Sequence, residues 1–232
     1  TTAGAALPKA GGTMTGNLTI DGDTTLSAYN NTTAITENAV DIFVYDTSKD
    51  SDGGAWRKRT QHTSWYNEAS SSTRGARKDF PSIAVIVATT TKVTIYDGDT
   101  PDLSMWMSFS IHNQGDAVGN DSLLRGTTIS SIAALNAEIV VADGNNYAGN
   151  TLNFLYDGIV ESRTLRGYVF NGNIAQRNDD IGWYYSSLGM RLASQYVNDV
   201  AMTVLPNAPI DSVTGLPIPT IAVATNGGVS VI

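Results

Sequence analysis

The chain has no cysteine and only two histidines among its 232 residues. Without cysteine it has no disulfide framework, no thiolate metal site and no thiol nucleophile. A general base at neutral pH is most often a histidine, and no Gly-x-Ser-x-Gly segment provides a serine nucleophile for His62 or His112. We interpret both histidines as structural or surface residues and expect no enzymatic activity.

Charge is scarce as well. Charged residues make up 16% of the chain, below the roughly 25% typical of soluble domains, and the net charge is −8. A general nucleic-acid binder needs a basic face, so no nucleic-acid partner is expected. The longest apolar run, Ile83–Ala88, is far shorter than the ~18 residues of a membrane-spanning helix. We therefore expect no membrane insertion.

In place of charge the chain has β-branched residues and turn residues, with 22 glycines. Short apolar segments alternate with Gly, Asp and Asn, which predicts an all-β fold of the sandwich or propeller-like kind. Only residues 187–197 show helical spacing. We expect strands near residues 40–45, 82–88, 92–96, 105–111, 128–132, 138–142, 152–155, 166–170, 201–204, 220–224 and 229–232.

The sequence divides into a slender N-terminal segment, residues 1–39, and a β-rich domain, residues 40–232, with a candidate boundary near 115–125. The first segment contains single apolar residues between polar ones, with two expected strands around Asp21-Gly22. So thin a segment cannot close a core by itself and needs partner chains or the next domain. Similar strand-and-turn units at 138–146 and 220–228 suggest a repeat, and we expect a longer gene product.

One aromatic and basic segment contains the candidate binding residues. Aromatic planes and arginine forks suit sugars, carboxylates or a protein partner, so the segment is a candidate ligand-binding face. The favoured alternative is an inter-strand or inter-subunit salt-bridge network, with the subunit-interface version first, against Asp46, Asp50, Asp52 and Asp79. The candidate residues for ligand or subunit contacts are Trp56, Arg57, Arg59, Trp65, Tyr66, Arg74 and Arg77.

Metal candidates come from turn segments rich in aspartate. Residues 48–53 resemble the start of an EF-hand loop, but the twelfth position holds Arg59 where that loop needs a bidentate glutamate. No catalytic carboxylate pair is expected, because each pair lies in a turn signal where Asp is favoured for backbone hydrogen bonding. A structural calcium ion is the one cofactor considered, with candidate ligands Asp50, Asp52, Asp97 and Asp99.

The segment Leu7–Ile20, with its Gly-Gly-Thr-Met-Thr-Gly core at residues 11–16, closely resembles a short segment that recurs in tail-fibre proteins of tailed bacteriophages. There it precedes or links shaft modules and fibre domains. Residues 40–68, 74–81, 92–99 and 197–206 resemble blocks in virion structural proteins of marine phages, including cyanophages. The resemblance implies a location in the virion, and it supplies no catalytic residues.

The leading hypothesis is therefore a homotrimeric virion appendage protein, in which residues 1–39 form a fibre or attachment segment that contacts other virion proteins and supports attachment to the host receptor. The alternative is a carbohydrate-binding module for a host surface glycan, in which aromatic residues stack on sugars. A polysaccharide-degrading enzyme is a third hypothesis. The stacking candidates are Trp56, Trp65, Tyr66, Trp106 and Trp183–Tyr185.

Overall fold

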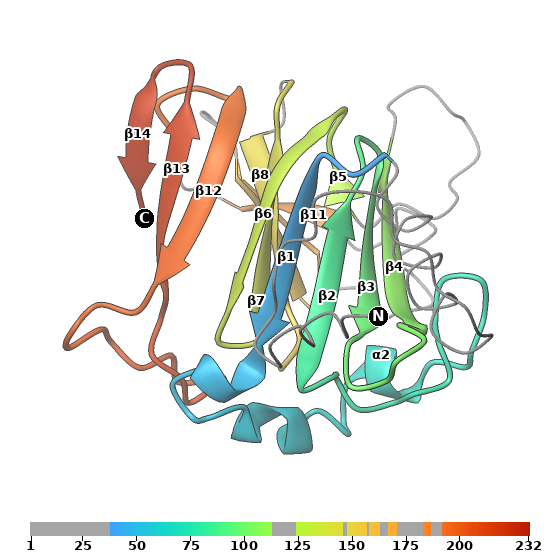
Figure 1. Cartoon of the computed structure of the whole chain (residues 1–232). Coiled ribbons are helices and arrows are strands. Elements are labelled where there is room, and N and C mark those ends of the chain that lie inside the picture. Colours follow the sequence, from blue (N-terminus) through green and yellow to red (C-terminus); the bar gives the residue numbers. More distant parts are fainter. Residues whose placement is uncertain are drawn as a thin grey trace, which may run out of the picture.

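The computed structural model describes residues 38–112, 124–145, 148–156, 158–162, 167–170, 183–186 and 192–232. Its strands form three sheets, which confirms the all-β class (Figure 1). The N-terminal segment and its two expected strands lie outside the described residues, apart from residues 38 and 39. No helix among the described residues is both long and apolar enough to span a bilayer.

The first sheet has the strand order β1-β2-β3-β4-β5. All its neighbours are antiparallel except β4 and β5, which pair in parallel over two residues. Between β1 and β2 the chain forms three short helical turns, η1 (Thr47–Lys49), η2 (Ala55–Arg59) and α2 (Ser64–Asn67). The strands are β1 (Asp41–Asp46), β2 (Ile83–Ala88), β3 (Lys92–Asp97), β4 (Met105–His112) and β5 (Leu124–Arg125).

The central sheet is an antiparallel meander, and a third, three-stranded sheet follows it in the sequence. In Figure 1 the third sheet stands at one side of the molecule, with β14 outermost. The central sheet contains β6 (Ile129–Leu135), β7 (Glu138–Asp143), β8 (Ala148–Asn153), β9 (Gly158–Ser162), β10 (Gly167–Phe170) and β11 (Trp183–Ser186); the third contains β12 (Val197–Thr203), β13 (Thr220–Thr225) and β14 (Gly228–Val231).

Both faces of β7 in the central sheet are buried. Successive side chains of a strand point to opposite faces, and in β7 Ile139 and Val141 belong to the core shared with the first sheet. Val140 and Ala142 belong to a second core with Val197, Val200, Ile221 and Val223 of the third sheet. The continuous apolar run of β7 follows from this position, because a strand packed on both sides has no solvent face.

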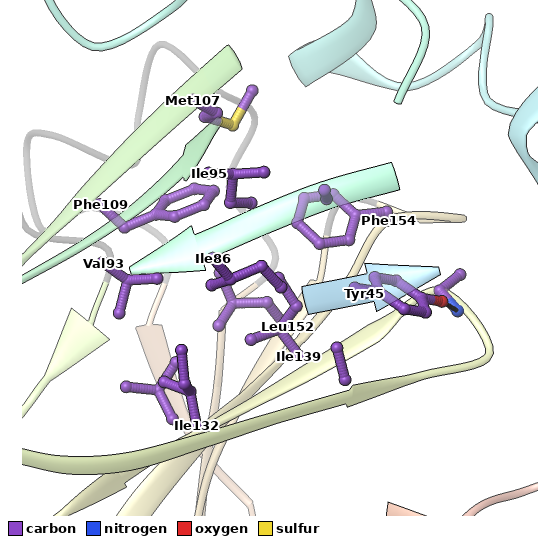
Figure 2. Close-up of a cluster of buried hydrophobic side chains, with 14 of the residues drawn as sticks. Tyr45, Ile86, Val93, Ile95, Met107, Phe109, Ile132, Ile139, Leu152 and Phe154 are labelled. Atoms are coloured by element: carbon purple, nitrogen blue, oxygen red, sulfur yellow. Dashed lines mark hydrogen bonds between the residues drawn. The ribbon is translucent and has the colours of Figure 1, made fainter. Parts of the chain in front are cut away.

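Figure 2 shows the larger core, where side chains of the first sheet and of the central sheet point toward one another. Full burial of one such aliphatic or aromatic side chain contributes roughly 1.5–3 kcal/mol. The packing of sheet on sheet is consistent with the sandwich form of the prediction. The labelled residues are Tyr45, Ile86, Val93, Ile95, Met107, Phe109, Ile132, Ile139, Leu152 and Phe154.

The expected strand positions are confirmed for most of the described chain, and the differences have clear causes. The strand expected at 152–155 lies earlier, at Ala148–Asn153, and the one at 201–204 begins at Val197. The short strands β5, β9 and β11 were not predicted. For the helix expected at 187–197, residues 192–196 are irregular and Val197 starts β12, because its side chain packs in the second core.

The suggested repeat is wrong in the described residues. Asp143, Gly144 and Asn145 begin the connection from β7 to β8 in the central sheet, whereas Asn226 and Gly227 form the turn from β13 to β14 in the third. The first unit belongs to a six-stranded sheet and the second to a three-stranded one. The two units therefore share turn chemistry, and they are not equivalent blades.

The turn between β6 and β7 is the point where the layers are tied together. Asn136 and Ala137 have φ values of 51° and 67°, as a two-residue type I′ hairpin turn requires. The Asn136 side chain accepts a hydrogen bond from the Ser51 N–H at 2.9 Å and donates to Ser51 Oγ and to the carbonyl of Pro217, both at 2.9 Å. One asparagine thus joins the helical segment, the central sheet and the loop before β13.

We predict that Asn136→Ala lowers the free energy of unfolding by about 2 kcal/mol, since it removes three side-chain hydrogen bonds and strains the left-handed backbone. Asn136→Gly loses the same bonds but adopts positive φ freely. The glycine variant should therefore recover about 1 kcal/mol relative to alanine, as measured by urea unfolding. A glycine variant no more stable than the alanine variant would contradict the assigned backbone strain.

Candidate functional site

The aromatic and basic segment that supplied the candidate site residues folds inward. Trp56 and Trp65 are buried, together with Trp106 of β4. The ring centroids of Trp65 and Trp106 are 5.1 Å apart, and those of Phe80 and Trp106 are 4.8 Å apart, in edge-to-face contacts that aromatic quadrupoles favour. These three indoles form the end of the main core and present no stacking surface to a ligand. The side chains of Trp183–Tyr185 lie outside the described residues.

Asp50 is the polar centre of this cluster and is only 6% exposed. Its Oδ2 accepts hydrogen bonds from the Tyr45 hydroxyl and from Trp56 Nε1, both at 2.6 Å, and its Oδ1 accepts from the Asn136 N–H at 2.8 Å. Burial raises the pKa of Asp50 against the opposing effect of the bonds from Tyr45 and Trp56. Burial, followed by the charge of Asp50, also raises the pKa of Tyr45. This candidate metal ligand thus serves as a structural acceptor.

Arg74 is a buried cation, 1% exposed, that contacts backbone carbonyls. Its guanidinium lies over the Trp106 ring, 4.9 Å from the centroid. Because five N–H groups in a rigid fork can reach several carbonyls at once, a single side chain holds the loop before β2 in shape. It donates to the carbonyls of Trp65, Gly75, Arg77, Trp106 and Lys78 at 2.6–3.2 Å.

Arg57 and Arg59 also bind within the chain. Arg57 Nε donates to the carbonyl of Phe80 at 2.9 Å. Arg59 Nη1 donates to the carbonyl of Thr214 at 2.7 Å, and its Nη2 lies 3.4 Å from Asp52 Oδ2. Arg59 therefore ties η2 to the loop between β12 and β13. The salt-bridge interpretation fits this part of the segment, but the pairing described here is inside one chain.

The candidate metal ligands Asp97 and Asp99 are held by Arg77. Arg77 Nη1 lies 2.7 Å from Asp97 Oδ1 and 2.7 Å from Asp99 Oδ2. Partial burial would lower the pKa of Arg77, but the hydrogen bonds to the two carboxylates outweigh it and raise that pKa. Asp99 also accepts from Ser82 and from the Ile83 N–H. These donors hold the two carboxylates of the turn in place.

The pH dependence of the Asp99 contacts has a definite sign. Burial alone would raise the pKa of Asp99, but the bonds from Ser82 and Ile83 and the contact with Arg77 hold it well below its usual range. A carboxyl with a depressed pKa in the folded state stabilises the fold above its unfolded pKa, about 4, and this stabilisation is lost as the pH falls toward the folded pKa.

We therefore predict that Asp99→Ala costs about 1 kcal/mol of unfolding free energy at pH 7, a figure reduced by solvent screening. The difference from the unsubstituted protein should shrink as the pH falls below about 4, because the unfolded carboxyl is protonated first. Urea unfolding at pH 7 and pH 2.5 measures both values. Equal penalties at the two pH values would contradict the assigned role.

The remaining candidate residues are more accessible. Tyr66 is half-buried, with its ring 6.0 Å from that of Trp65 and with Lys78 Nζ 5.7 Å from its centroid. Asp52 is half-buried and accepts from the Gly54 N–H. His62 is exposed. Across the part of the chain that the structure describes, no group of three or more His, Cys, Asp or Glu side chains could hold a metal ion.

A half-buried acid and a half-buried phenol that sequence reasoning missed lie where the central sheet meets the loop before β13. Burial raises the pKa of Glu138 despite a hydrogen bond from Asn153, and the charge of Asp211 adds to the effect. Burial, with the charges of Glu138 and Asp211, raises the pKa of Tyr156 to about 12. No local motif marks these residues, because only the packing of distant segments brings them together. Raised pKa values of this kind follow from burial and do not define a catalytic site by themselves.

The arrangement as a whole is suited to rigidity. The candidate arginines bind backbone carbonyls or aspartates, and the indoles fill the core, so the segment anchors helical turns, sheets and the C-terminal loop to one another. No protein-family model matches the chain, and no curated protein matches it. The inferences that follow therefore depend on the residues and contacts of this chain.

Proposed function

We propose that the chain is a structural component of a bacteriophage virion appendage, of the tail-fibre kind, that assembles as a homotrimer and supports attachment to the host receptor. The observation that carries the proposal is the Leu7–Ile20 segment, whose Gly-Gly-Thr-Met-Thr-Gly core resembles the linking segment of tail-fibre proteins. In this proposal the work of the chain is mechanical and non-enzymatic.

One structural feature and one expectation from the sequence support a mechanical role. The three sheets are cross-tied by buried polar groups, among them Asp50, Asn136 and Arg74. Buried networks with every bond in place rigidify a core, which suits a part that transmits force between the particle and the host surface. The sequence also predicts that residues 1–39 need partner chains, and this expectation is consistent with a trimer.

Labelling the particle tests the proposal directly. An antibody against an exposed epitope of residues 38–232 should decorate an appendage of the intact phage in electron micrographs, and native mass spectrometry of the isolated protein should give three chain masses. A monomer at micromolar concentration would contradict the trimer. Particles left undecorated by an antibody that binds the free protein would contradict the location.

The carbohydrate-binding alternative has less support. Its stacking candidates Trp56, Trp65 and Trp106 are buried in the core. Among the stacking candidates whose side chains the structure describes, only Tyr66 is partly exposed to solvent. A glycan array would test it, and loss of a positive signal in Tyr66→Ala would locate the site. This alternative is therefore ranked second.

A further inference from the structure

Large apolar side chains are exposed in two separate parts of the described chain. Soluble monomers rarely leave such groups uncovered, and uncovered groups mark contacts with a partner. The first place is the outer face of β1, with Val40, Ile42 and Val44. The second is the C-terminal unit, residues 192–232, with Leu205, Ile210, Val213, Ile218, Val229 and Val231.

The outer face of β1 is apolar because alternate residues of the strand point to it and these residues are apolar. Ile42 and Val44 point away from the core that Tyr45 enters, and Val44 is 62% exposed. Their antiparallel neighbour Val85 on β2 is half-buried and extends the same face, whereas Val87, the partner of Ile42, is buried (2% exposed). No charged residue occurs at these five alternating positions, so covering the face removes no charge from water.

The exposed apolar residues of the C-terminal unit include several in a loop whose conformation is fixed by hydrogen bonds. The loop between β12 and β13 is closed by bonds from the Ile218 N–H to the carbonyl of Pro209 (2.8 Å) and from the Asp211 N–H to that of Leu216 (2.9 Å). Arg59 and Asn136 anchor it to the rest of the protein. The loop could not bury Val213, 72% exposed, without losing these bonds, so the exposure is built into the structure.

The last strand adds an open sheet edge to this unit. β14 pairs with β13 on one side, and in Figure 1 it forms the outer margin of the third sheet. Val229 and Val231 lie on this strand. Natural proteins protect open edges with lysine, proline or charge, and β14 contains none of these. An unprotected edge with exposed valines is suited to being covered by another chain.

We propose that the occupant is a second copy of this chain, and that the C-terminal unit of one protomer packs on the β1 face of the next. The inference rests on the proposed trimer and names its contact. Two different patches on one chain give a head-to-tail contact, which closes into a ring when repeated by rotation. A twofold dimer would instead need one self-complementary patch.

The charge distribution favours a copy of the chain over a charged partner. The C-terminal unit contains two charged side chains, Asp199 and Asp211, among residues 192–232, whereas the whole chain has 14 Lys and Arg and 22 Asp and Glu. A chain of net charge −8 can approach its copy most easily where both faces lack charge, since depletion of charge is typical of interface cores.

Val44→Glu and Val231→Glu test the contact, one on each patch. Both side chains are largely exposed, so folding should be unaffected, as circular dichroism would verify. Each glutamate should weaken assembly about 100-fold, because it buries an unpaired charge in the interface. Native mass spectrometry should then show monomers for either variant at a concentration where the unsubstituted protein is trimeric. Thr91→Glu, at the exposed turn between β2 and β3, is the matched control and should stay trimeric.

A mixture of the two variants distinguishes a head-to-tail contact from other arrangements. Val44→Glu keeps its C-terminal unit and Val231→Glu keeps its β1 face, so an equimolar mixture should form a 1:1 heterodimer through one intact contact. Trimers that persist in both variants would overturn the contact while leaving the proposed trimer intact, with another segment covering the patches. An unsubstituted protein that is monomeric would overturn both.

Discussion

Replacing Asp50 with alanine should cost about 4 kcal/mol of unfolding free energy, the largest loss expected from a single carboxylate in the described structure. The carboxylate accepts from Tyr45, Trp56 and the Asn136 N–H. Removing it leaves three buried donors without an acceptor, and each unmet donor costs roughly 1–3 kcal/mol. The variant should unfold at a much lower urea concentration, or fail to fold at 37 °C.

Two further variants separate the contributions at Asp50. Asp50→Asn keeps the shape and one acceptor oxygen, but its amide faces the Trp56 N–H, which can only donate; an intermediate loss is expected. Asp52→Ala removes a neighbouring half-buried carboxylate, bound to Gly54 and 3.4 Å from Arg59, and should cost less than about 1 kcal/mol. Equal losses for Asp50→Ala and Asp52→Ala would show that the buried network is not the cause.

The second large effect is expected at Arg74, where lysine is not a conservative substitute. Arg74→Lys keeps the charge but replaces a fork of five donors with three donors on one nitrogen. An ammonium cannot reach the carbonyls of Trp65, Trp106 and Lys78 together, so a buried charge is left poorly solvated. We expect a loss of about 3–5 kcal/mol, measured by urea unfolding and by the near-ultraviolet circular dichroism of the Trp106 environment.

Lys78→Met is the control for Arg74. Lys78 is exposed, and its ammonium contacts the ring of Tyr66 at 5.7 Å. Loss of an exposed cation–π contact should cost no more than about 1 kcal/mol. If Arg74→Lys is as stable as the unsubstituted protein, the five carbonyl bonds do not contribute as assigned. If Lys78→Met is as damaging as Arg74→Lys, the loss is not specific to the carbonyl bonds of Arg74, since Arg74→Lys keeps the net charge.

Local patterning was enough to predict most strands. β2, β3, β4, β7, β13 and β14 lie within one residue of their expected limits, because alternation and flanking turn residues are properties of the local sequence. The turn at Asn136-Ala137 had no such signal: it adopts positive φ with an alanine in it because contacts to Ser51 and Pro217, distant in the sequence, hold it there.

For the candidate site, in contrast, the sequence predicted the notable residues but not the positions of their side chains. Composition identified Trp56, Arg57, Arg59, Trp65, Arg74 and Arg77 as notable residues, but a residue type does not say which way its side chain points. Only packing decided that the indoles fill a core and that Arg74 binds carbonyls. The sequence also did not predict that the valines of β1 and β14 are exposed, since an apolar residue in a strand is expected to face inward.

By itself, then, the sequence determined an all-β protein with little charge, no cysteine and short strands in a definite order. These are consequences of composition and of a period-two pattern, which act over a few residues. The tertiary structure decided the three-layer stacking, the inward path of the aromatic and basic segment, and the two uncovered apolar patches. Those depend on contacts between residues 80 or more positions apart, such as Asp50 with Asn136 and Arg59 with Thr214, and no local pattern contains them.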